Sequence, residues 1–184
     1  MKKFTLILMF SLFLFSCSEN SVTNPENPAK QLLKLPSSIA KSNGETEFLR
    51  SKEINGVDGD TINFSFPYES ISGKTVTISG VLEIPKGAFD YSTTFILEVD
   101  KEEAVIKFSP SPSFFDKALR LNLFYEGLNL NPIEEEDVDF YYINEKEKTL
   151  EPIESKIKIF EKDKGELGII EAEIWHFSRF GWYI

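Results

Sequence analysis

The chain has one cysteine, Cys17, and one histidine, His176, among its 184 residues. A lone cysteine excludes an internal disulfide and a thiolate metal cluster. With a lone histidine, a Ser-His-Asp triad would have to be built at that position, and a histidine-based zinc site lacks ligands. The sequence also has no GxSxG elbow and no glycine-rich phosphate loop. These absences argue against a conventional hydrolase, and we expect no metal and no cofactor.

Basic residues are also scarce. The chain has 20 Lys and Arg against 30 Asp and Glu, which gives a formal net charge of -10. A nucleic-acid-binding protein needs a basic patch to face the phosphates. We therefore expect no nucleic-acid partner.

Long apolar runs are absent as well. Residues 4–15 are almost entirely apolar, but a dozen residues are too few for a helix that crosses a bilayer, which needs about 20. Met1, Lys2 and Lys3 give this run a basic start, which is the layout of a secretory signal.

The signal ends in LFSC, with Leu14 three residues before Cys17 and the small residue Ser16 beside it. This segment resembles the lipobox of bacterial lipoproteins. The resemblance implies that residues 1–16 are removed, that the thiol carries a diacylglyceryl group and that the new amine is acylated. Several acyl chains hold a protein to a membrane where one would not. The chain is thus expected in the bacterial envelope, on the periplasmic or surface face of the outer membrane. The alternatives are an uncleaved anchor or an incidental free cysteine.

Residues 17–47 are interpreted as the lipidated cysteine and a flexible tether. The stretch SENSVTNPENPAK is rich in Ser, Asn and Pro and has little apolar surface to bury. The following QLLKLP has a few apolar residues, and whether it docks as a short helix or strand is left open. The folded domain is predicted over residues 48–184.

The domain shows apolar residues in alternation with polar ones, and turn residues separate the runs. This period of two is typical of β-strands, and no window shows a helical apolar stripe. Strands without crossover helices favour an all-β fold, an antiparallel β-sandwich. Strands are predicted over residues 61–66, 74–84, 93–99, 104–108, 119–125, 137–143, 156–160 and 168–177.

Four stretches occur in a fixed order: GVLEIPKGAF, FSPSPSFFDKALRLNLFYEGL, VDFYYINEKEKTLEPI and IWHFSRFGW. Together they resemble the ZU-five-type β-sandwich, and most of all its bacterial lipoprotein relatives. The resemblance implies a fold used in protein interaction and scaffolding, without a shared enzymatic activity. Fold alone does not give function.

The triplet His176-Phe177-Ser178 is the most suggestive chemical motif. Residues i and i+2 of a strand share a face, so His176 could activate the Ser178 hydroxyl. In some members of the resembled family such a triplet breaks its own chain between Phe and Ser. The alternative is a packing corner at the end of a strand.

Two further groups are candidates for binding. Trp175, Trp182 and Tyr183 are candidates for an exposed surface that binds a protein or glycan partner, with core packing as the alternative. The acidic run Glu134 to Asp137 offers oxygen ligands for Ca²⁺, but it lacks the EF-hand spacing, and a solvated loop is the favoured interpretation.

The leading interpretation is an envelope lipoprotein, held to the lipid membrane through acylated Cys17, with a non-catalytic interaction or structural module. The alternatives are a self-processing domain that cleaves at Phe177–Ser178 and a glycan-binding module.

Overall fold

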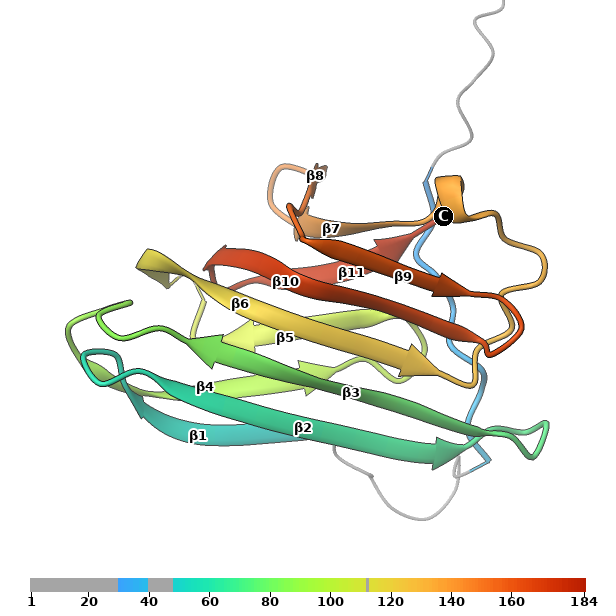
Figure 1. Cartoon of the computed structure of the whole chain (residues 1–184), viewed down its shortest axis with the longest axis horizontal. Coiled ribbons are helices and arrows are strands. Elements are labelled where there is room, and N and C mark those ends of the chain that lie inside the picture. The colour runs from blue at the N-terminus through green and yellow to red at the C-terminus, as the bar shows by residue number, and fades with distance from the viewer. Residues whose placement is uncertain (1–29, 40–47, 112) are drawn as a thin grey trace, which may run out of the picture.

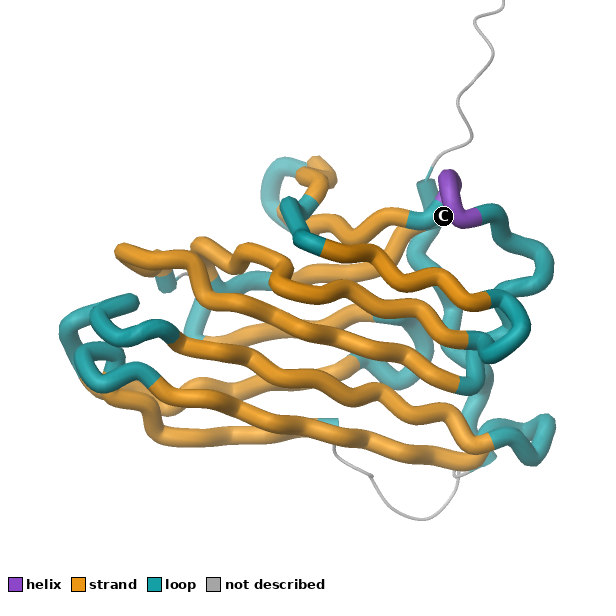
Figure 2. Tube along the Cα trace, in the orientation of Figure 1, coloured by secondary structure: helices purple, strands orange, loops and turns teal. Residues whose placement is uncertain are grey.

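The computed structural model describes residues 30–39, 48–111 and 113–184. Two antiparallel sheets pack face to face, as Figures 1 and 2 show. The six-stranded sheet has the order β1-β4-β5-β11-β7-β8, and the five-stranded sheet has the order β2-β3-β6-β10-β9. The predicted antiparallel β-sandwich is confirmed. The strands are β1 (Leu49–Asn55), β2 (Asp60–Glu69), β3 (Thr75–Ile84), β4 (Ser92–Val99), β5 (Val105–Ser109), β6 (Phe114–Glu126), β7 (Asp139–Asn144), β8 (Thr149–Pro152), β9 (Ile157–Glu161), β10 (Glu166–His176) and β11 (Arg179–Tyr183).

Alternation in the sequence fixes which side of each strand faces the core. In β6, Leu119, Leu121 and Leu123 are fully buried, while Arg120 between them is exposed. β3 and β10 flank β6 in the five-stranded sheet and alternate in the same way over most of their length. The apolar sides of both sheets form one continuous core, which offsets the entropy cost of ordering the strands.

Three strands were not predicted from the sequence: β1, β8 and β11. β1 (LRSKEIN) buries one residue of its seven, and β8 buries none, so neither has the alternation that marks a half-buried strand. β11 (RFGWY) is buried at four consecutive positions. A strand covered on both faces shows no alternation, which is why its pattern was missed.

A segment that we call the N-terminal strap, residues 30–39, crosses one end of the sandwich (Figure 1). Gln31 and Ile184 exchange two backbone hydrogen bonds of 2.8 Å, and Leu33 N–H donates to Trp182 O at 2.9 Å. Further along, Leu35 N–H donates to Glu102 O, and the Tyr68 hydroxyl donates to Pro36 O. The strap therefore pairs with the end of the six-stranded sheet and then reaches β2 of the other sheet.

The strap belongs to the packed domain, because Leu33 and Leu35 are buried in the main core. The expected boundary at residue 48 is therefore too late, and the tether interpretation does not hold for residues 30–39. QLLKLP has few apolar residues, but Leu33 and Leu35 are enough to hold it in place because they pack into the main core at the end of the sandwich. The remaining tether residues, 17–29 and 40–47, lie outside the described residues.

The two ends of the sandwich differ in the connections and termini that lie there. The strap, the C-terminus, the β2–β3 turn and the β9–β10 turn gather at one end, which we call the strap end (Figure 1). The β1–β2, β3–β4, β5–β6 and β10–β11 connections lie at the opposite end, which we call the free end. Any tether that precedes residue 30 therefore joins the domain at the strap end.

We predict that Leu33→Ala lowers the free energy of unfolding by about 2–5 kcal/mol, as expected for a truncated buried leucine. Urea unfolding of the full chain, followed by circular dichroism, measures this. The matched control is Ile39→Ala, because Ile39 in the same strap is 56% exposed and its loss is expected to cost less than about 0.5 kcal/mol. Equal effects of the two substitutions would contradict the buried role of the strap.

A second prediction concerns Tyr68. Burial raises the pKa of the Tyr68 hydroxyl to about 12 from its ordinary value of 10.0. Because the folded state holds this proton more tightly than the unfolded state, the stabilisation is complete below pH 10 and is lost as the pH rises through 12. We expect the urea midpoint to fall over this window, and to fall less steeply in Tyr68→Phe. Identical slopes for the two proteins would contradict this assignment.

Candidate functional site

Cys17, the predicted lipidation site, lies outside the described residues. Within the part of the chain that is described, no helix has the length and apolar character needed to cross a membrane.

The His176-Phe177-Ser178 triplet forms the corner between β10 and β11 at the free end. The His176 ring lies 4.6 Å from the Tyr142 ring and 5.8 Å from the Phe114 ring, measured between centroids. Phe177 is 1% exposed and packs its ring against Phe95 and Phe115, at 4.3 and 4.9 Å. The triplet is thus an aromatic packing corner.

The backbone of this corner is held on both sides. Phe177 N–H donates to Ser113 O, the Ser111 hydroxyl donates to Phe177 O at 2.9 Å, and Phe108 N–H donates to Ser178 O. Among the described residues, no hydrogen bond joins the His176 imidazole to the Ser178 hydroxyl. Among the described residues, the non-glycine residues with a positive φ are Lys148 and Glu171. The corner therefore has no strain from a left-handed backbone.

The Ser111 hydroxyl, which donates to the Phe177 carbonyl, is the feature of this corner that self-cleavage could use. It would stabilise the negative charge that develops on that oxygen. Proton transfer from Ser178 to His176 needs a contact that this geometry does not provide. The corner therefore supports packing better than cleavage.

Two of the three predicted surface aromatics are buried, and that prediction was wrong. Trp182 is 0% exposed and belongs to the main core, 5.2 Å from the Phe140 ring. Tyr183 is 9% exposed and packs on the other face with Val105, Tyr141 and the strap residue Leu32. β11 has a neighbouring strand on each side and this small second cluster on its outer face. Gly181, Trp182 and Tyr183 of the terminal GWYI are therefore buried, while Ile184 is 38% exposed.

Trp175 is the remaining member of the group, and it is 52% exposed. Its neighbour Ile174 is fully buried, so alternation along β10 turns the indole away from the core. Phe114, at the start of β6, is 73% exposed and pairs in register with His176. Phe114 was not singled out from the sequence, because adjacent residues of a strand face opposite ways and the sequence does not show which of Phe114 and Phe115 is outside. Both exposed rings come from the end of the sandwich opposite the strap.

The acidic run forms a short 3-10 helix, η1 (Glu135–Asp137), in place of the predicted loop and strand start. The Glu134 carboxylate pairs with Lys162 at 2.8 Å, and Lys158 Nζ donates to Glu135 O. In the described ranges, no group of three or more His, Cys, Asp or Glu side chains is arranged to hold a metal ion. The run is best described as a solvated, lysine-paired connection.

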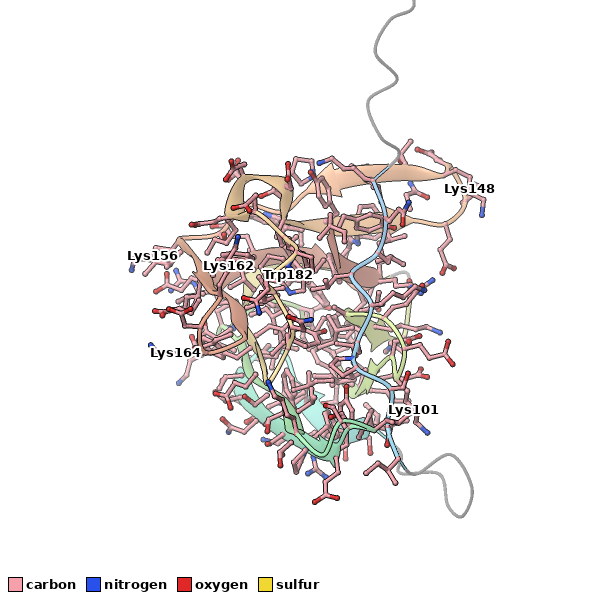
Figure 3. All side chains as sticks on the ribbon, turned by 90° about the vertical axis from the view of Figure 1, so that its right-hand side faces the viewer. Lys101, Lys148, Lys156, Lys162, Lys164 and Trp182 are labelled. Atoms are coloured by element: carbon pink, nitrogen blue, oxygen red, sulfur yellow. The ribbon has the colours of Figure 1, made fainter. Side chains whose placement is uncertain are left out.

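A polar cleft of about 430 Å³ opens at the strap end. Figure 3 views this end and shows Lys162 and Lys164 on the side of the five-stranded sheet. The cleft is lined by Lys74, Lys162, Lys164, Asn129 and Asn131, among other residues. Lys162 pairs with Glu134 and Lys164 pairs with Glu161, so these two lysines are largely neutralised by neighbouring carboxylates.

The corner geometry predicts an uncleaved chain. We expect intact-mass measurement under denaturing conditions to show one species that includes residues 178–184. Denaturing conditions are needed because β11 would stay paired with β5 and β7 after a cut. Ser178→Ala is the control and should give the same single species with the mass of the substitution. A separate fragment of residues 178–184 in the parent protein, absent from Ser178→Ala, would show self-cleavage.

No protein-family model, no curated protein and no solved structure matches this chain. The resemblance to the ZU-five-type sandwich therefore stays a prediction from the four sequence stretches.

Proposed function

We propose that this chain is a bacterial envelope lipoprotein, anchored through acylated Cys17, whose ZU-five-like sandwich is a non-catalytic interaction module. One observation carries the proposal. The chain joins the sandwich at the strap end, whereas Trp175 and Phe114 are exposed toward the opposite end. A domain tied to a membrane through its strap end would present these aromatics away from the lipid.

The strap supports this arrangement because it fixes where the tether leaves the domain. Residue 31 is hydrogen-bonded to the last residue of the chain, and the strap then continues across the end of the sandwich. If the tether proposed between Cys17 and residue 30 runs as a flexible chain, its r.m.s. reach is about 20 Å. That reach holds the strap end close to the anchoring surface and leaves the free end accessible.

A non-catalytic role is supported by the contacts of His176-Phe177-Ser178, the motif best suited to catalysis. His176 is in contact with the rings of Tyr142, Phe114 and Phe180. Phe177 fills the core, and its carbonyl is held by Ser111. These residues close the free end of the sandwich and so maintain the module.

We predict that Cys17→Ala moves the protein from the membrane fraction to the soluble fraction, because acylation needs the thiol. Fractionation and immunoblotting of the full chain measure this, together with metabolic labelling with a fatty acid. Ser18→Ala is the matched control and should keep both the label and the membrane location. Membrane retention of Cys17→Ala, or no acyl label on the parent chain, would contradict the anchoring proposal.

A further inference from the structure

The outer face of the five-stranded sheet has a row of polar side chains that crosses four strands. Thr61, Glu83, Arg120 and Glu173 lie directly opposite one another on β2, β3, β6 and β10. All four are exposed, and the last three lie between buried neighbours in their strands, so they point to solvent. Directly opposite residues on antiparallel strands have Cβ atoms about 5 Å apart, which makes this row one continuous polar strip.

Arg120 is central to this strip. Glu83 and Glu173 are its two cross-strand neighbours, yet among the described residues Arg120 has neither an ion pair nor a side-chain hydrogen bond. Its guanidinium donors and the acceptors of both carboxylates are therefore available to a ligand. By contrast, Glu171 on the same strand is already paired, in a 3.2 Å bridge with Lys156.

An aromatic ring lies toward each end of the face formed by β6 and β10. Trp175 is two residues beyond Glu173 on the same face of β10. In the other direction, Phe124 is half-buried opposite Gly168, where an added Cβ would lie 2.7 Å from the Phe124 ring. Gly168 thus leaves room for the ring to lie across the β10 backbone. Six residue steps separate the two rings along the strands, or about 20 Å.

We propose that five residues on the outer face of β6 and β10 form a binding strip for a neutral, β-linked polysaccharide chain: Trp175, Glu173, Arg120, Asn122 and Phe124. The faces of a sugar ring are apolar and suit an aromatic side chain, while its hydroxyl rim suits carboxylate acceptors and guanidinium donors. Chains of β-1,4-linked sugars are extended, which matches two rings in line with polar groups between them. The inference names a ligand class for the interaction module proposed above and rests on that function.

The charge and polarity of the strip decide between ligand classes. Two carboxylates flank one guanidinium, and the chain has a net charge of -10, so an anionic polymer would be repelled. A protein partner would favour a contiguous apolar centre, which the outward residues Glu83, Arg120 and Glu173 do not form. A neutral polyhydroxyl chain fits both features.

Binding is tested with the full chain, solubilised in detergent, on insoluble cellulose, chitin, xylan and mannan. We expect at least one polymer to deplete the protein from solution, and Trp175→Ala to weaken that binding at least tenfold. Arg120→Lys should weaken it severalfold, because an ammonium does not reproduce the planar donor fork. Ile71→Ala is the matched control, since Ile71 is 67% exposed at the strap end, and should bind like the parent. The proposal is overturned if none of the four polymers binds, or if Trp175→Ala binds as tightly as the parent.

Fluorescence provides an independent measurement, because the chain has two tryptophans and Trp182 is fully buried. A soluble oligosaccharide of the bound polymer should shift the emission of the parent and leave that of Trp175→Phe unchanged. A shift that persists in Trp175→Phe would place the ligand elsewhere and overturn the proposal. Cys17→Ala should keep full binding in detergent, so a failure of the anchor and a failure of the binding strip give different results.

Discussion

The structure depends on the way β11 is held. Its five residues pair with β5 on one side and β7 on the other, at the centre of the six-stranded sheet. Trp182 fills the main core on one face, and Tyr183 belongs to the smaller cluster on the other. Because β11 follows β10 after a two-residue corner, its position also fixes the place of the His176-Phe177-Ser178 triplet. The last strand of the chain thus joins the two sheets at the free end.

The same strand also receives the N-terminal strap. Leu33 N–H donates to Trp182 O, while Leu33 O accepts from Ala104 N–H, so the strap bridges β11 and the residue just before β5. Leu33 and Leu35 then fill the space between the sheets. A segment with few apolar residues is part of the domain, because the two sheets supply both its hydrogen-bond partners and the apolar surface against which it packs. The first and last described residues of the chain consequently lie side by side.

The sequence was sufficient to predict the fold class and eight of the eleven strands, because most of those strands have one buried face and one solvated face. It was insufficient for β11, where the alternation disappears because both faces are covered. The strap was left open for a related reason: Leu33 and Leu35 are buried by distant residues. The acidic run forms a 3-10 helix, which is too short to give a periodic signal in the sequence. The local pattern thus predicts which face of a strand is buried. It does not show where segments distant in the sequence cover a strand.

The candidate surface shows the same limit at the level of single residues. Trp175 and Trp182 both lie in strands, and both were candidates for an exposed surface, with core packing as the alternative. On β10, Trp175 follows the buried Ile174, and no other described segment covers the outer face there, so the indole is exposed. On β11, Trp182 points inward between the sheets. The cross-strand register, which a single sequence does not contain, also determines that Arg120 lies between Glu83 and Glu173. Each residue of the binding strip is of a type common on protein surfaces. Together they form a candidate site because the strand register places them in one row on an exposed face.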